Sequence, residues 1–293
     1  MKRILSCLML IGILFALCSC GNGETAEMSR PNIAQPGSEK ETELVLTERV
    51  SVEEADTVNA YRLHVDVEKA KEEVENAFGI TLGPPTVDGM YVGPDYVVTI
   101  DQETGYWTYD SNESYSSLEP SEAPLSDAAA QEIAEQFVKD HGLWTGEVYN
   151  TVVTDITGGG WNEPEYSLGK DVYIYPGVEG KTILGVFRIV ISMDHEGRLF
   201  SVYKLATDID RAVPVQVKTR DMLEEDFASQ NYSDSCSQQL QMPSIEEGSL
   251  QYYADAQAVN GMTYLYPVYV FTGEGTTADG QQERFDVIID AQG

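Results

Sequence analysis

The chain has 293 residues, with 49 Asp and Glu against 18 Lys and Arg, and its formal net charge at pH 7 is −31. A protein this acidic repels phosphate groups, so nucleic acid and anionic lipid headgroups are poor partners, whereas cations and basic proteins are attracted. With 42% hydrophobic residues, the chain is long enough for two or three small domains.

The amino-terminal residues have the layout of a secretory signal peptide. Two basic residues precede an apolar run from Ile4 to Leu17, which is shorter than the roughly 20 residues that cross a bilayer. The run ends in Leu17-Cys18-Ser19-Cys20, which resembles the lipobox of bacterial lipoproteins. That resemblance implies a lipoprotein signal peptide over residues 1–19, cleavage before Cys20 and a lipid, diacylglycerol and palmitate, on the cysteine. An ordinary signal peptide with incidental cysteines is the alternative.

The lipobox predicts an extracytoplasmic protein that is anchored to the cell membrane by its lipid. Several acyl chains hold a protein stably where one is marginal, at about 0.8 kcal/mol per buried CH₂ group. Residues 20–42 are polar, contain Pro and Gly and lack an apolar period, which predicts a disordered tether. The mature chain keeps Cys20 and Cys236, so lipidation of Cys20 leaves no intrachain disulfide.

A helix followed by strands recurs three times, which predicts an N-terminal module over residues 43–118, a middle module over 122–212 and a C-terminal module over 213–293. Each module has a helix with an apolar face. The expected helices are Val65–Ile80, ended by Gly79, Leu125–Leu143, capped by Ser126, and Thr219–Ala228.

Strands follow each expected helix. The N-terminal module has a hairpin, Tyr96–Asp110, in which Gly105 supplies a positive φ for the turn. The other expected strands are Tyr149–Ile156, Asp171–Tyr175, Gly185–Met193, Leu199–Ala206, Leu250–Tyr253, Tyr264–Thr272 and Phe285–Asp290. Pro267 favours an edge strand or a bulge. We therefore predict an α+β fold of tandem modules, each a helix packed on an antiparallel sheet, with chance similarity of the repeats as the alternative.

Two stretches resemble known families. The hairpin TIDQETGYW (Thr99–Trp107) is similar to the PepSY domain. The C-terminal stretch from Leu250 to Ala291 resembles YycI-type proteins, through its Tyr-Tyr-Ala-Asp and Pro-Val-Tyr-Val-Phe strands. The resemblance covers roughly Lys170 to Ala291 and, more weakly, Val65 to Asp110. It implies an extracytoplasmic regulator of a sensor kinase in a Gram-positive bacterium. YycI-type proteins have a transmembrane helix instead of a lipobox, so contact with a kinase's membrane helix does not carry over.

Catalytic chemistry has little support in the sequence. The three histidines, His64, His141 and His195, lie far apart in the chain, and neither an HExxH nor a GxSxG motif is present. We expect no catalytic residue, no resident metal and no cofactor. Weak cation binding by acidic residues at 110–122 or 208–210 is an alternative, although neither stretch has EF-hand spacing. Cys236 has no basic residue or histidine close by in sequence and is interpreted as a buried or idle thiol.

Aromatic residues are the better candidates for function. Tyrosine and tryptophan that face outward from a sheet offer apolar area with a polar tip, which suits contacts with protein or glycan. The candidates are Tyr106, Trp107, Tyr109, Trp161, Tyr264, Tyr266 and Tyr269. A helix or domain covering that face is the structural alternative. We predict a non-enzymatic lipoprotein that binds or regulates another cell-envelope protein. Alternatives are a solute- or glycan-binding lipoprotein and an inhibitor of a secreted peptidase.

Overall fold

The structure is a computed structural model, and it describes residues 28, 30–33, 42–87, 89–112, 118–121, 123–158, 166–257 and 263–293. The chain divides into two compact units, residues 1–30 and 31–293. The predicted signal peptide 1–19, the lipidation site Cys20 and the contact residue Trp161 lie outside the described residues, as does most of the predicted tether. Among the described residues, no helix combines the length and the apolar character needed to cross a membrane.

The fold is mostly β-structure, with 47% strand and 15% helix. The strands join in one large mixed sheet, and the described helices are α2, α3 and α4. The predicted tandem of helix-on-sheet modules is therefore wrong. Its error lies in strand pairing, because β5 of the expected N-terminal module pairs with β10 of the middle one. Edge strands with unpaired backbone groups gain hydrogen bonds by pairing with a neighbouring sheet. The sheets of the expected modules therefore merge into one.

The three helices follow the predicted local signals. Helix α2 spans Val67–Phe78, with the Asp66 side chain accepting from Lys69 N–H and Gly79 left-handed at φ 62°. Helix α3 spans Asp127–Asp140, and the side chain of Ser126 caps it as predicted. Helix α4 spans Arg220–Ala228 and is capped by Thr219.

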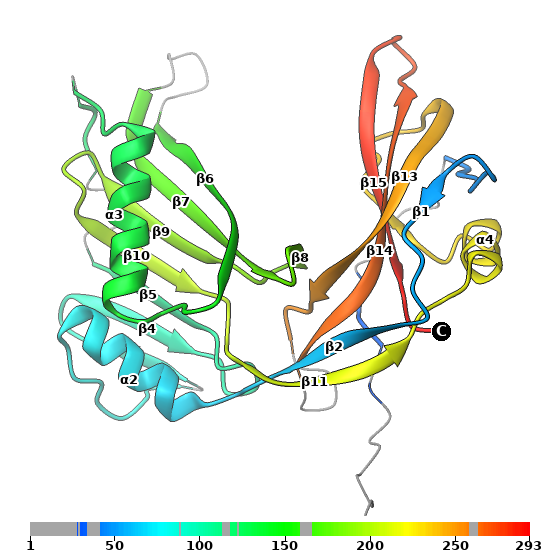
Figure 1. Ribbon diagram of the computed structural model, residues 1–293. Coiled ribbons are helices and arrows are strands. Elements are labelled where there is room, and N and C mark those ends of the chain that lie inside the picture. The colour runs from blue at the N-terminus through cyan, green and yellow to red at the C-terminus, as the bar shows by residue number, and fades with distance from the viewer. Residues whose placement is uncertain are drawn as a thin grey trace, which may run out of the picture. The chain divides into compact units, whose positions relative to one another are not determined.

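One half of the sheet has the order β8-β7-β9-β10-β5-β4-β3, with β6 on the other side of β7. Its strands are β3 (Met90–Val92), β4 (Tyr96–Ile100), β5 (Trp107–Ser111), β6 (Glu147–Gly158), β7 (Tyr166–Val178), β8 (Lys181–Gly185), β9 (Ile189–Asp194) and β10 (Leu199–Lys204). Helices α2 and α3 lie on one face of this half (Figure 1), where Val74, Ala134 and Ile191 share a core.

The other half continues from β8 through β13, β14 and β2 to β11, and β15 lies beside β14. Its strands are β1 (Ser51–Val52), β2 (Thr57–Leu63), β11 (Ile209–Gln216), β12 (Ser233–Asp234), β13 (Gln241–Ala254), β14 (Tyr264–Thr276) and β15 (Gln282–Asp290). Helix α4 covers it, and Phe227 contacts Phe271 edge to face at 5.2 Å.

The start of the folded chain belongs to this second half. Leu44, Leu46 and Val50 are buried in its core, and burying each such side chain contributes about 1.5–3 kcal/mol. Thr42, the last residue of the predicted tether, is itself buried, and its hydroxyl accepts a hydrogen bond from Leu240 N–H. Strands β2 and β11 pair antiparallel, and they connect the second half with α2 and with β10 (Figure 1).

Pro267 occupies a different position from the predicted edge or bulge. Strand β14 is a central strand, paired with β13 along one side. On its other side it pairs with β2 up to Leu265 and with β15 from Val268 onward. Pro267 falls in the gap between these two partners. No neighbouring strand on this side needs an N–H donor there, so proline is tolerated.

Candidate functional site on the helix-free sheet face

The strand register defines two rows of side chains across the first half of the sheet. Directly paired residues point to the same face, so a row can be followed from strand to strand. The first row contains mainly apolar and aromatic residues: Val152, Tyr173, Val190, Tyr203, Thr108, Thr99 and Met90.

The helices lie on the opposite face. The neighbouring residues Val172, Ile191 and Val202 point the other way, and they belong to the core that contains residues of α2 and α3. Val190 is buried, at 9% exposure, but is not part of that core. Tyr173 and Tyr203 are half-buried, and Val152 is 38% exposed. We call the face that carries this row the helix-free face.

The second row on the helix-free face is polar. It runs through Thr154, Asp171, Ser192, Ser201 and Asp110. Ser192 Oγ donates to Asp171 at 2.6 Å, and Ser201 Oγ donates to Asp110 at 2.8 Å. Among the described side chains, no Lys or Arg forms an ion pair with either carboxylate.

Burial changes the proton affinity of one of these acids. Loss of water around Asp171 raises the pKa of its carboxyl, and the hydrogen bond from Ser192 offsets only part of that rise. A half-buried carboxylate without a counter-ion stabilises an approaching cation. Tyr173 stacks on Tyr175, with ring centroids 6.5 Å apart, beside this acid in the same strand. The helix-free face therefore combines aromatic area with unneutralised negative charge.

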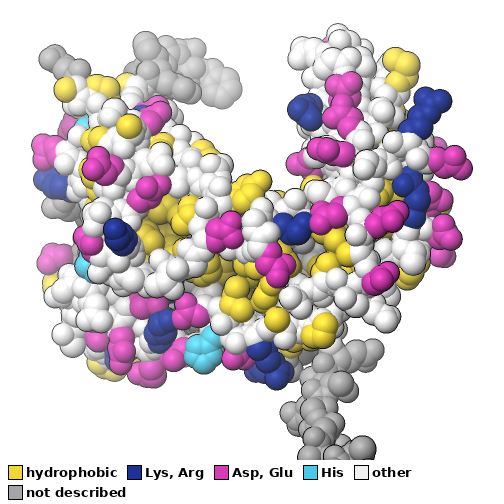
Figure 2. All heavy atoms as spheres, in the orientation of Figure 1, with side chains coloured by type: hydrophobic (Ala, Val, Ile, Leu, Met, Phe, Trp, Pro, Cys, Tyr) yellow, Lys and Arg dark blue, Asp and Glu magenta, His cyan; other side chains and the backbone are white. Residues whose placement is uncertain are grey.

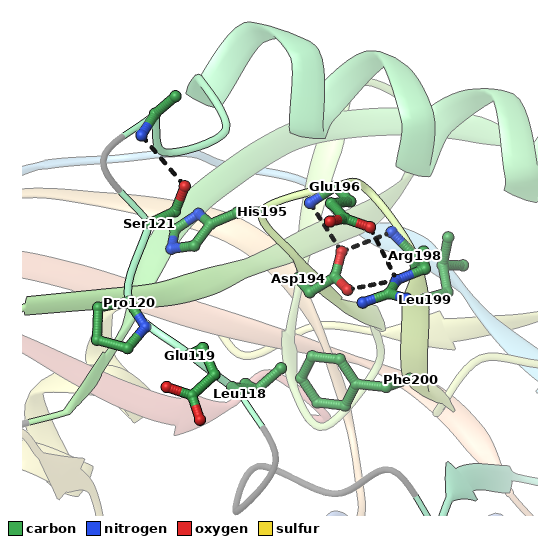
Figure 3. Close-up of a pocket in the computed structure, with 11 residues that line it drawn as sticks. Leu118, Glu119, Pro120, Ser121, Asp194, His195, Glu196, Arg198, Leu199 and Phe200 are labelled. Atoms are coloured by element: carbon green, nitrogen blue, oxygen red, sulfur yellow. Dashed lines mark hydrogen bonds and ion pairs between the residues drawn. The ribbon is translucent and has the colours of Figure 1, made fainter.

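A pocket of about 640 Å³ opens at the turn that joins β9 and β10 (Figure 3). Its lining includes Glu119, Pro120, Glu196 and Phe200. Such a volume lies in the range of small-molecule sites.

Asp194 and His195 in this pocket already have hydrogen-bond partners within the protein. Burial raises the pKa of Asp194, but hydrogen bonds from the backbone N–H and the guanidinium of Arg198 outweigh it, so the pKa lies below its usual value. His195 Nδ1 accepts from Leu125 N–H at 3.3 Å, and Nε2 lies 3.0 Å from the carbonyl of Ser167, to which it donates. Both ring nitrogens therefore hold the fold together, and a general base needs a free one.

Most of the predicted contact residues lie in the interior. The exposed fractions are 5% for Tyr106, 1% for Trp107, 5% for Tyr264, 1% for Tyr266 and 2% for Tyr269. Tyr109 is half-buried and stacks on Phe78 of α2 at 3.6 Å. The structural reason is coverage, since α2 lies over β5, and the first residues of β14 are buried on both faces. Buried rings do not form an exposed contact surface.

The sequence pattern of one strand on the helix-free face indicated that one side of the strand is buried and the other is not. In Asp171-Val-Tyr-Ile-Tyr175, aromatic or polar residues alternate with aliphatic ones, the pattern of a strand with one face in a core. Val172 and Ile174 are buried, whereas Tyr173 and Tyr175 are half-buried. Which strands would lie beside this one was not readable, because pairing depends on segments distant in the chain.

The three histidines lie on different elements of the fold. His64, His141 and His195 lie before α2, at the end of α3 and in the β9–β10 turn. Within the described part of the chain, no group of three or more His, Cys, Asp or Glu is arranged to hold a metal ion. Burial raises the pKa of the Cys236 thiol to about 12, and Asp234 adds to the rise.

Comparison with known proteins finds no matching family model and no match among curated proteins. Two solved structures are similar at 12% identity each. An uncharacterized protein from Eubacterium rectale matches with a TM-score of 0.43, over 81% of this chain and 85% of its own. The Bacillus megaterium YpeB C-terminal domain matches with a TM-score of 0.32, over 76% of this chain and 98% of its own.

Proposed function

We propose that this protein is a non-enzymatic, extracytoplasmic lipoprotein, anchored through Cys20, that binds or regulates another protein of the cell envelope. The contact surface is the helix-free face, centred on Tyr173. The single observation that carries the proposal is the row Val152–Tyr173–Val190–Tyr203 on a sheet face opposite the helices. Half-exposed tyrosines beside small polar residues are typical of protein interfaces.

Charge and sequence support the same conclusion. Acidic side chains are spread over the face seen in Figure 2, among fewer Lys and Arg side chains. Such a surface favours basic proteins over nucleic acid or anionic lipid. The lipobox at Leu17–Cys20 supports a location outside the cytoplasm, and the sequence resemblance to PepSY and YycI-type proteins supports a regulatory role.

Site-specific photo-crosslinking in intact cells tests the contact surface. A photoreactive phenylalanine replaces Tyr173 in the full chain, and a matched probe replaces Val45, which is 60% exposed in the irregular segment before β1. We expect a crosslinked protein product at position 173 and none at position 45. Equal products at both positions, or none at position 173, contradict the proposal.

The pocket at the β9–β10 turn favours a second candidate, binding of a small solute or glycan. Its volume of about 640 Å³ and the presence of Phe200 and Arg198 in its lining fit a polar ligand with an apolar side. A thermal-shift screen against sugars and peptides tests it, because a ligand at about 100 times its Kd stabilises by about 2.7 kcal/mol. Loss of the shift in Phe200→Ala assigns the ligand to this pocket.

A further inference from the structure

Strand β6 forms a long free edge of the sheet. It pairs with β7 and, among the described strands, with no other. Eight of its twelve residues are exposed, including Val148 at 46%, Tyr149 at 51% and Val152 at 38%. An edge strand presents a row of unpaired N–H and C=O groups, which is a template for one more strand.

The other edges of this sheet carry the usual protection. The edge strand β11 contains Arg211 and Pro214, residues that obstruct pairing. Strand β3 has only three residues, and β15 is covered by the segment 233–237 through hydrogen bonds such as Ser235 N–H to the Asp286 carbonyl. Strand β6 contains no Pro, Lys or Arg. Among the described edge strands, β6 is therefore long, open on one side and without a basic residue or proline.

The central part of β6 has regular strand geometry. Register shifts lie between Val148 and Asn150 and between Ile156 and Thr157, so residues 150–156 pair with β7 without interruption. This stretch, NTVVTDI, is rich in β-branched residues. On the helix-free face it presents Val152 beside Tyr173, and on the other face it presents Asp155 beside Lys170.

The charges around this edge are acidic. Glu135 of α3 accepts a hydrogen bond from Thr151 of β6 at 3.1 Å, and Asp171 lies opposite Thr154. The one cation in contact with β6, Lys170, is 8% exposed and lies between Asp127 at 2.6 Å and Asp155 at 2.9 Å, among the described ion pairs. A second copy of the chain, with its own net charge of −31, would meet like charge at this edge.

We propose that the free edge of β6 binds an extended, basic segment of a partner protein by strand addition. Basic side chains of the segment lie on the α3 side, near Glu135 and Asp155, and aliphatic ones lie beside Val152 on the helix-free face. Backbone hydrogen bonds provide the binding energy, and the charges select a basic sequence. This inference deepens the proposed function, on which it rests for the identity of the partner as an envelope protein.

The test uses the full chain and short synthetic peptides of two kinds, one with Lys alternating with Val and one with Glu alternating with Val. Binding is measured by calorimetry, and hydrogen exchange reports on the amides of residues 150–156. We expect the Lys peptide to bind and to slow exchange there by about tenfold, as added ladder hydrogen bonds require, and the Glu peptide to do neither.

A pair of substitutions provides the matched control. Val152→Lys places on β6 a residue type that commonly protects edge strands and that repels a basic peptide, and we expect it to weaken binding of the Lys peptide by about tenfold or more. Ile209→Lys makes the same change on the edge strand β11, where Ile209 is 37% exposed against 38% for Val152, and leaves binding unchanged. Unchanged thermal unfolding in both variants confirms that the fold is intact.

The inference is overturned by no binding of the Lys peptide, by equal binding of both peptides, or by equal effects of the two substitutions. Protection of residues 150–156 without peptide, together with a dimeric mass, identifies a second copy as the occupant and also overturns it. A different result would contradict the proposed function. If position 173 yields no crosslink but the Lys peptide binds in a Val152-dependent way, the strand-addition site stands and the helix-free face is not the contact surface.

Discussion

The phenol of Tyr61 donates a hydrogen bond of 2.5 Å to the carboxylate of Glu179, which is 118 residues away in the chain. Tyr252 donates to the other oxygen of the same carboxylate at 3.0 Å. Glu179 and Gly180 both have positive φ, in the turn that joins β7 to β8. One exposed carboxylate on this turn thus holds two buried tyrosines, from β2 and β13.

Glu179→Ala tests this contact. The substitution removes the shared acceptor of two part-buried hydroxyls, and we expect the free energy of unfolding to fall by about 1 kcal/mol. Urea denaturation measures the change. In a Tyr61→Phe/Tyr252→Phe background the same substitution has a much smaller effect, because no hydroxyl remains to lose its partner. Equal effects in both backgrounds would assign the loss to the turn instead.

The buried ion pair beneath α2 gives a larger effect. Lys204 Nζ lies 2.6 Å from Glu73, with side-chain exposures of 5% and 10%, and Trp107 donates its indole N–H to the same carboxylate at 3.0 Å. Lys204→Met leaves the poorly solvated Glu73 carboxylate with only its longer ion pair to Lys69, at 3.8 Å, and lowers the free energy of unfolding by about 3 kcal/mol. Adding Glu73→Gln, which keeps an acceptor for Trp107, recovers part of this loss in the same urea experiment. An additive double variant would contradict the pairing.

Two acids near β6 predict opposite responses to pH. Burial raises the pKa of Asp171, so its charged form destabilises the folded state at neutral pH, and this penalty disappears as the pH falls below the usual value. Asp171→Asn therefore raises the Tm at pH 7 and has little effect at about pH 3. Thermal unfolding followed by circular dichroism measures the Tm of the unsubstituted protein and of the variant at both pH values.

Asp155 supplies the matched control with the reverse sign. Hydrogen bonds from Lys170 and Ser167 lower the pKa of Asp155. Its stabilising contribution is present above the usual pKa and is lost as the pH falls through the lowered one. Asp155→Asn therefore lowers the Tm at pH 7, and the difference disappears in acid. If both substitutions changed the Tm at pH 7 in the same direction, the net charge of the protein, rather than the surroundings of each acid, would control the response.

A close backbone approach at Gly185 makes this residue sensitive to substitution. Gly185 has φ 83°, and a Cβ there would lie 2.2 Å from the Ala254 carbonyl oxygen in the neighbouring strand β13. Gly180, at φ 71°, has no atom within 4 Å of the same position. We expect Gly180→Ala to cost about 1–2 kcal/mol for its backbone alone, and Gly185→Ala to cost more, by urea denaturation. Equal costs would show that β13 moves without penalty.

The proposed lipid anchor has a direct test. We expect Cys20→Ala to abolish incorporation of labelled palmitate and to release the protein from the membrane fraction. Cys18→Ala, which changes the neighbouring cysteine outside the lipidation position, keeps both the label and the location. Labelling that survives Cys20→Ala would contradict the lipobox interpretation.

Signals within a few residues were readable from the sequence. Ser126 caps its helix as predicted, and Gly79 and Gly105 have the positive φ that their stop and turn require. The alternation in β7 and in β14 identified both as strands. These features depend on contacts between near neighbours in the chain.

The arrangement of the strands depended on contacts that the sequence does not mark. Leu44 to Leu63 join the half of the sheet that contains the C-terminus, and β5 pairs with β10, although each was expected in the N-terminal module. The buried state of Trp107 and Tyr266 follows from these neighbours. Any strand with an apolar face satisfies the same period of two, so the sequence by itself determined the three helices and the strands with clear alternation, and it did not predict β2 or β11. Only the tertiary structure decided which strands pair, which face the helices cover and which edge remains free, because backbone hydrogen bonds between strands are nearly independent of side-chain identity.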